Sequence, residues 1–135
     1  MSRAVDAGLV GHLVTGGSLS DSKEALKITR ERSDCFSTCG VHPTRCDELE
    51  NSENQENYYQ QLVEVAKDGK VLAIGECGLD YDRLHFCSRP VQLKWFERQL
   101  NISMQLKKPL FLHLREYSGM AFLPYILILH DTSNE

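Results

Sequence analysis

Apolar and polar positions divide the chain into short apolar runs and longer stretches with helical spacing. The apolar runs predict strands at residues 9–17, 35–43, 71–77 and 109–115. Between them, apolar residues recur every three to four positions in segments 19–32, 57–70 and about 90–107, which predicts amphipathic helices. The polar stretch from 44 to 56 predicts a loop. Strands that alternate with helices in this way are typical of βα units with a buried parallel sheet, and therefore of the α/β class.

Residues that favour helix ends support these boundaries. Ser20 or Asp21 is suited to begin the first helix, and Ser88, followed by Pro90, is suited to begin the third. Gly69 favours the end of the second helix. The side chains that we expect on the buried side of the third helix are Trp95, Phe96, Leu100, Ser103 and Met104.

Composition narrows the class of protein. The chain has 135 residues, of which 41% are apolar and 25% charged, as expected for one globular domain. No apolar run approaches the roughly 20 residues that span a bilayer, and the first residues lack the pattern of a secretory signal, so we expect no membrane attachment. The net charge of −4 and the pI of about 5.7 argue against broad electrostatic binding to nucleic acid. Contacts with phosphate would then be local or mediated by a metal ion.

The cysteines indicate a reducing compartment. Their number is odd and they form no CxxC motif, so we expect free thiols in a nuclear or cytoplasmic protein rather than a disulfide framework. The five are Cys35, Cys39, Cys46, Cys77 and Cys87.

Three side chains of catalytic or metal-binding type stand at the ends of predicted strands. Glu76 directly ends the apolar run VLAIG, His113 lies in FLHLR, and His42 lies in GVHP. Because the carboxyl ends of parallel strands meet at one edge of a sheet, we expect the three to converge there. Alternation along the last strand places Phe111, His113 and Arg115 on one face, with His113 at the mouth of the site.

A carboxylate at a buried strand end suggests a metal site. Burial of a charged Glu76 is costly unless the group is paired or binds a metal. Its two oxygens can bridge two hard cations such as Mg²⁺ or Mn²⁺, the arrangement used for displacement at phosphorus. Each residue also has a purely structural interpretation. Glu76 could belong to a solvated loop or an ion pair, His113 could be a hydrogen-bonded core histidine, His42 could anchor a turn, and Arg115 could be a surface cation.

A zinc module is a separate alternative. Cys39, His42 and Cys46 have the spacing C-x2-H-x3-C, which resembles zinc ligands, with Cys77 as a conceivable fourth. The pattern spans a strand end and lacks a clear fourth ligand, which argues against it.

Five segments together resemble TatD-family metal-dependent deoxyribonucleases. They are TGGSLSDSKEAL, STCGVHPTRCDELE, VLAIGECGLDYDRL, QLKWFERQL and KPLFLHLR, in the order of that family, and the resemblance covers about residues 4–115. It implies a TIM-like (β/α)8 barrel of the amidohydrolase type that cleaves DNA phosphodiester bonds with two divalent metals (Mg, Mn or Zn). By this match Glu76 is the catalytic, metal-bridging carboxylate and His113 a catalytic metal ligand. His42 and Arg115 match positions that line the substrate pocket.

The chain also departs from the family pattern. A first strand with Asp-x-Gly-x-Asn or His-x-His residues has no counterpart here, and after Arg115 the sequence differs, with His130 an unlikely replacement for a later ligand. We therefore expect residues 1–115 to form a partial barrel of about four βα units instead of eight, followed by a non-family tail at 116–135. Such a truncated form is expected to be marginally stable and a poor catalyst alone, with sheet edges open to self-association. A non-catalytic fragment or interaction product is the alternative.

Overall fold

Four parallel strands and the helices between them build the part of the chain that the structure, a computed structural model, describes, residues 6–116. The strands are β1 (His12–Val14), β2 (Cys35–Cys39), β3 (Val71–Asp80) and β4 (Leu110–Arg115). The helices are α2 (Leu19–Arg30), α3 (Cys46–Glu50), α4 (Gln55–Ala66) and α5 (Arg89–Leu106), with a short 3-10 turn η1 (Pro43–Arg45) before α3.

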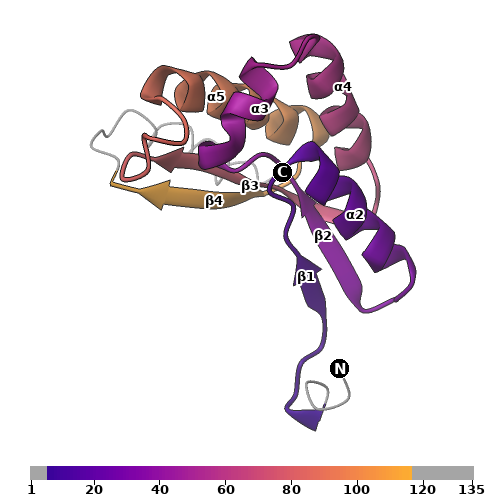
Figure 1. The fold of residues 1–135 in the computed structure, drawn as a ribbon. Coiled ribbons are helices and arrows are strands. Elements are labelled where there is room, and N and C mark those ends of the chain that lie inside the picture. The colour runs from indigo at the N-terminus through magenta and orange to yellow at the C-terminus, as the bar shows by residue number, and fades with distance from the viewer. Residues whose placement is uncertain (1–5, 117–135) are drawn as a thin grey trace, which may run out of the picture.

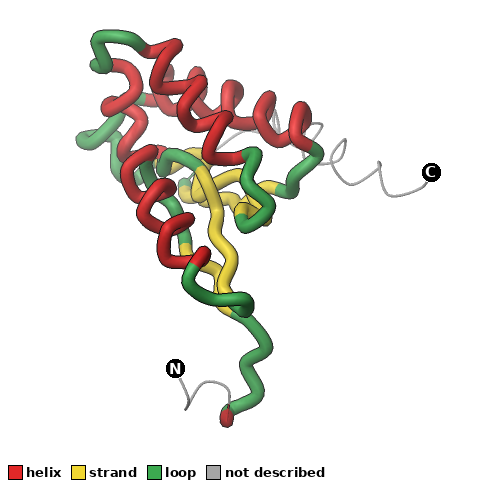
Figure 2. Tube along the Cα trace, turned by 90° about the vertical axis from the view of Figure 1, so that its right-hand side faces the viewer, coloured by secondary structure: helices red, strands yellow, loops and turns green. Residues whose placement is uncertain are grey.

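The sheet has the topology of half a βα barrel. Its strand order is β1-β2-β3-β4, all pairs are parallel, and the helices lie on one side of the curved sheet (Figures 1 and 2). Each new strand is therefore added at the same edge, as in a (β/α)8 barrel. Among the described residues β1 and β4 each pair on one side only, so both form free edges. The predicted fold class, a partial barrel of four βα units, is confirmed.

The core lies between the sheet and the helices. Its larger cluster joins the start of β3 and the end of β2 to α2, α4 and α5 and includes the wholly buried Trp95 and Ile74. A smaller cluster packs the far end of β3 against α5 through Cys77, Leu79 and Phe96. Burial of β3 between two neighbouring strands and α5 makes it the central strand, which explains its nearly unbroken apolar sequence.

Several predicted boundaries need correction. Helix α2 begins after Ser18, whose hydroxyl accepts the Asp21 N–H, and not at Ser20 or Asp21. The predicted loop 44–56 contains η1 and α3, because its apolar Cys46 and Leu49 pack into the core. Strand β3 runs three residues beyond Cys77 to Asp80.

The buried side of α5 also differs from the prediction. Met104 is 45% exposed, and Ile102 is buried in its place. Two glutamines, Gln92 and Gln99, lie on the same buried side. They are seven residues apart, two helical turns, and therefore point the same way.

The two glutamines fasten α5 to the loops at the carboxyl ends of the strands. The Gln99 side chain accepts the Val41 N–H at 2.7 Å and donates to the Val41 carbonyl at 3.1 Å. The Gln92 side chain does the same for the N–H and carbonyl of Asp80, at 2.8 and 2.9 Å. Each side-chain amide thus pairs with buried backbone N–H and carbonyl groups that strand pairing leaves unbonded. Gln99 fixes the backbone next to His42, and Gln92 fixes it at Asp80.

Two lysines have the corresponding role at the amino ends of the strands. Lys108 Nζ donates to the carbonyls of Ala66, Asp68 and Val71, all within 2.6 to 2.8 Å. Lys70 Nζ donates to carbonyls of the α2–β2 connection and β2 and lies over the Phe36 ring. This rim is held by charge-assisted bonds to backbone and has a structural role.

Replacement of Gln99 by methionine tests the importance of these clamps. The Gln99→Met protein keeps a side chain of similar length but leaves the buried N–H and carbonyl of Val41 unpaired. We expect the free energy of unfolding, measured by urea denaturation, to fall by about 2–4 kcal/mol. Gln105→Met, at an exposed position of the same helix, is the matched control and should change it by less than about 0.5 kcal/mol. Equal effects of the two substitutions would contradict this role.

All five cysteines are free and buried, which predicts slow thiol chemistry. Burial raises the pKa of Cys39 and of Cys77 to about 12, so neither is a thiolate at neutral pH. We expect iodoacetamide at pH 8 to leave Cys39 and Cys77 unmodified in the native protein and to label both after denaturation, as measured by peptide mass spectrometry. Labelling of either thiol at the same rate in both states would show that the described core is wrong.

Candidate metal centre at the carboxyl ends of the strands

Two imidazoles and two carboxylates converge where β2, β3 and β4 end. His113 Nδ1 lies 3.1 Å from Glu76 Oε1, and His113 Nε2 lies 3.1 Å from Asp80 Oδ2. His42 Nε2 is 4.0 Å from the same Glu76 oxygen, and the two imidazole rings meet edge to face with centroids 4.3 Å apart. The four side chains therefore form one cluster, in which His113 stands between the two carboxylates.

A bulge in β3 accounts for the position of Glu76. The register with β4 shifts between Gly75 and Cys77, so Glu76 faces no partner residue on β4. Its N–H instead donates to the carbonyl of Gly16, just beyond β1, at 2.8 Å. Bulges of this kind redirect a side chain out of the regular alternation. Glu76 is therefore within the strand, four residues before its end, with its carboxylate turned toward the histidines.

Asp80 ends β3 and is wholly buried. After the bulge, Glu76, Gly78 and Asp80 alternate on the site side of the strand, while Cys77 and Leu79 enter the core. Gly78 has a φ of +141°, and a Cβ there would lie 2.0 Å from the His113 carbonyl oxygen. Only glycine allows this approach between β3 and β4, which brings Asp80 next to the His113 ring.

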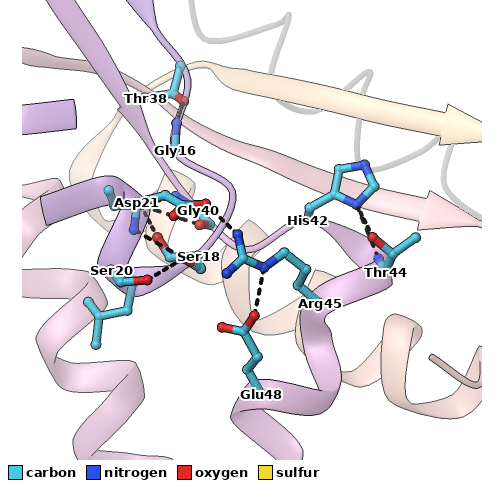
Figure 3. A network of polar contacts seen from close by, with 12 residues as sticks. Gly16, Ser18, Ser20, Asp21, Thr38, Gly40, His42, Thr44, Arg45 and Glu48 are labelled. Atoms are coloured by element: carbon cyan, nitrogen blue, oxygen red, sulfur yellow. Dashed lines mark hydrogen bonds and ion pairs between the residues drawn. The ribbon is translucent and has the colours of Figure 1, made fainter. Parts of the chain in front are cut away.

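His42 comes from the loop after β2 and is oriented by its neighbour Thr44 (Figure 3). The Thr44 N–H donates to His42 Nδ1 at 3.2 Å, and the Thr44 hydroxyl lies 2.7 Å from the same nitrogen. In the same loop Arg45 pairs with Asp21 at the start of α2 and with Glu48 on α3. The loop is thus fixed on both sides, and Nε2 of His42 is left to face the cluster.

The pKa of His42 lies below its ordinary value. Burial is the main cause, the neighbouring His113 adds to it, and Arg83 contributes in the same direction, while Glu76 and Asp80 oppose it. Neutral imidazole is the form that binds metal ions and accepts hydrogen bonds. Ligation through Nε2 would require the ring proton on Nδ1, where the Thr44 hydroxyl would accept it in place of the bond that Nδ1 now accepts from the Thr44 N–H.

The structure brings three of the four predicted site residues together. Glu76, His113 and His42 lie in the cluster, whereas Arg115 pairs with Asp82 at 3.0 Å, on the loop after β3. The roles assigned to these residues remain predictions. The sequence reasoning missed Asp80. Glu76, Gly78 and Asp80 are alternate residues and therefore lie on one face of a strand, but this signal can be used only when the strand is known to extend past Cys77.

The cysteines do not form the alternative zinc site. In the part of the chain that the structure describes, the group of potential ligands close enough to share an ion is His42, Asp80 and His113, without a thiol. The Cys39, Cys46 and Cys77 thiols donate instead to the carbonyls of Leu62, His42 and Ile74. The zinc module is therefore not supported.

A divalent metal ion fits the cluster. The ligand atoms of His42, Asp80 and His113 lie within 4.8 Å of one another. Asp80 Oδ1 is buried without a hydrogen-bond partner, which is rare for a carboxylate oxygen and is explained if it ligates a cation. Two imidazoles with carboxylates suit Zn²⁺ or Mn²⁺ better than Mg²⁺, which prefers oxygen ligands. The donors and the unpaired oxygen both point to a metal site.

The fold and this cluster define a βα half-barrel with metal-ligating side chains at the carboxyl ends of its strands, where barrel enzymes carry their active sites. The family model for TatD related DNase matches residues 1–134. The chain belongs to the TatD-related DNase family, whose members are metal-dependent nucleases.

Similar proteins occur in bacteria and in eukaryotes. The chain is 40% identical over 116 residues to the 3'-5' ssDNA/RNA exonuclease TatD of Shigella flexneri, covering 86% of this chain and 42% of the relative. It is 42% identical over 128 residues to the deoxyribonuclease Tat-D of Schizosaccharomyces pombe, covering 90% and 41%. The structure of a TatD-family hydrolase from Entamoeba histolytica matches with a TM-score of 0.75 at 30% identity, covering 97% and 43%. The chain thus spans about two fifths of the length of these proteins.

None of the helices in residues 6–116 is both long and apolar enough to cross a bilayer. The predicted tail at 116–135, including His130, lies almost entirely outside these residues.

Metal binding can be measured without any assay of activity. We expect Mn²⁺ in excess to raise the melting temperature by about 5 °C, because an ion that binds only the folded state stabilises it. EDTA should reverse the shift. Asp80→Asn, which keeps the shape of the side chain but removes its charge, should lose most of the shift. Asp82→Asn, on the exposed loop nearby, should keep it. Equal shifts in both variants would argue against a metal at Asp80.

Proposed function

We propose that this chain carries part of the active site of a metal-dependent nuclease that hydrolyses DNA phosphodiester bonds. The observation that carries the proposal is the cluster of His42, Glu76, Asp80 and His113 at the carboxyl ends of the strands. The names of the relatives, exonuclease and deoxyribonuclease, support the same class of substrate. Because the net charge is −4, the affinity for a polyanion would depend on local groups and on the metal.

Each side chain of the cluster has a proposed role. Asp80, His113 and His42 would hold a divalent metal ion, and Glu76 would be the carboxylate shared with a second one. When bound, such ions supply positive charge for the phosphate oxygens and an activated water. Arg115, on the rim beside Asp82, is proposed to approach the DNA backbone.

The position of His113 explains why a cation suits this cluster. Both of its ring nitrogens face carboxylate oxygens at 3.1 Å, and both can donate only if the ring is protonated. A cation bound by Asp80 and Nε2 would take the place of one of these protons. Glu76 Oε1 would then accept the remaining N–H from Nδ1 and fix the tautomer and the ring orientation, and Oε2 would remain for a metal ion.

Hydrolysis by this chain alone is proposed to be slow. The described residues bring three ligating side chains to one ion, fewer than a pair of ions needs. The free edges of β1 and β4 would allow a second copy to pair with the sheet, which supports self-association as a route to a more complete site. A non-catalytic interaction product is the second candidate, favoured by the same open edges.

The segments CGVHPTRCDEL and GECGLDYDRL further suggest that the chain is related to the vertebrate TatD DNase domain-containing protein 1, as a shortened form. Its buried free thiols support a reducing compartment, the nucleus or the cytoplasm.

Cleavage of a labelled DNA oligonucleotide tests the nuclease assignment. We expect weak cleavage that requires Mn²⁺ or Mg²⁺ and stops with EDTA. Glu76→Gln and Asp80→Asn should each lower the rate by about 100-fold or more, because each removes a charge from the metal site. Glu53→Gln, at an exposed position between α3 and α4, is the control and should cleave normally. Equal background rates in all four proteins would favour the non-catalytic candidate.

A further inference from the structure

The loop between β3 and α5, residues 81–88, has an exposed middle, and its two ends are held by hydrogen bonds. Its middle, residues 82–86, is exposed throughout, and Phe86 is 56% exposed. Tyr81, just before this exposed middle, is half-buried, and Asp80 and Cys87 are buried. Because Asp80 belongs to the metal-ligand cluster, this exposed segment begins directly beside the candidate active site.

Hydrogen bonds fix the base of this β3–α5 loop. The buried side chain of Gln92 donates to the Cys87 carbonyl at 2.8 Å in addition to its two bonds with Asp80. The Tyr81 N–H donates to the Arg115 carbonyl on β4 at 3.0 Å. A turn bond from the Phe86 N–H to the Arg83 carbonyl, 3.1 Å long, closes the tip. The exposed side chains are thus presented by an ordered backbone, which lowers the entropy cost of binding.

Three arginines, Arg83 in the loop, Arg89 on α5 and Arg115 on β4, lie on or beside the β3–α5 loop, although the chain as a whole is acidic. Arg83 Nε lies 3.9 Å from Asp80 Oδ2, and the Arg83 side chain is about half exposed. Arg115 pairs with Asp82 at 3.0 Å, and the Arg89 guanidinium lies 4.5 Å from the Tyr81 ring centre. Because Asp82 is paired with Arg115 and the contact of Arg83 with the buried Asp80 is long at 3.9 Å, the exposed part of the Arg83 guanidinium can attract a phosphate at the mouth of the cluster.

Two exposed aromatic rings lie beside this charge. The rings of His85 and Phe86 are 4.2 Å apart between centroids and tilted by 41°. A single exposed phenylalanine is common on protein surfaces and needs no explanation. A pair of rings on a loop that also carries an arginine and that follows a metal-ligand carboxylate in the chain is different, because stacking aromatics combined with positive charge are what binds single-stranded nucleic acid.

We propose that the β3–α5 loop binds the substrate strand, with one base of single-stranded DNA stacked on Phe86 and His85 and one backbone phosphate bound by Arg83. The inference rests on the proposed nuclease function and adds to it the residues that recognise the strand. A single strand is favoured because the bases of a duplex are stacked on each other and cannot lie on a protein ring without being unpaired.

Binding in EDTA tests this inference separately from cleavage. The probe is a fluorescein-labelled single-stranded DNA oligonucleotide, and its affinity is measured by fluorescence anisotropy. We expect Phe86→Ala to weaken binding by about 5- to 100-fold, the effect of losing one base–aromatic stack. Arg83→Gln should lower the slope of log Kd against log salt by about 0.7, as expected for one lost phosphate contact on a single strand. Met104→Ala and Arg30→Gln, at exposed positions on α5 and α2, should change neither quantity.

Oligonucleotides with one abasic position identify the stacked base. The parent protein should lose affinity when the missing base is at one particular position, whereas Phe86→Ala should show no further loss there. Identical abasic profiles for the two proteins would overturn the proposal, as would an equal effect of Phe86→Ala on a blunt duplex. If Phe86→Ala cleaves DNA normally and binds it with unchanged affinity, the inference about the loop fails and the nuclease function stands. If the parent protein does not cleave DNA but its binding of single strands depends on Phe86, the nuclease function fails and the inference about the loop stands.

Discussion

A carboxylate that is completely removed from water is the constraint around which this structure is arranged. Burial of Asp80 at the end of β3 costs several kcal/mol unless partners replace the lost hydration. His113 supplies one partner, Arg83 lies nearby, and one oxygen has none among the described residues. The glycine at position 78, which lets β3 and β4 approach, is required for the same arrangement. The fold thus keeps at this point a polar site that a purely structural protein would have no reason to retain.

Helix α5 connects the core to this site. Most of its buried side chains are apolar, but Gln92 and Gln99 replace two of them and bind backbone at Asp80 and Val41. The same packing that stabilises the sheet therefore sets the positions of two residues in or next to the cluster. At the opposite rim Lys70 and Lys108 hold the amino ends of the strands. One rim is devoted to stability and the other to chemistry, as in complete βα barrels.

Local sequence patterns predicted much of this arrangement. Apolar periodicity predicted the strands and their parallel pairing. The rule that the carboxyl ends of parallel strands share one rim predicted that Glu76, His113 and His42 lie close together. Asp80 was missed because the length of β3 depends on pairing with β4, which a strand pattern alone does not reveal. The buried glutamines and the exposed Met104 were missed for a related reason. Helical periodicity identifies the buried face of α5. It does not reveal that this face contacts unpaired peptide groups at Val41 and Asp80, because those groups belong to other segments of the chain.

Gln92 holds the backbone at both ends of the β3–α5 loop, at Asp80 and at Cys87. The position of Asp80 is therefore set separately from the conformation of the loop that follows it. The loop leaves and rejoins the scaffold at points held by one side chain, so the backbone of Asp80 is held independently of the exposed middle of the loop, and Arg83 contacts only the Asp80 carboxylate. Length and composition of that loop are consequently free to drift during evolution while the reactive centre stays in place. Under the proposed function, exchange of a few surface residues in this loop would change the preference for a substrate strand while the candidate metal ligands stay in place.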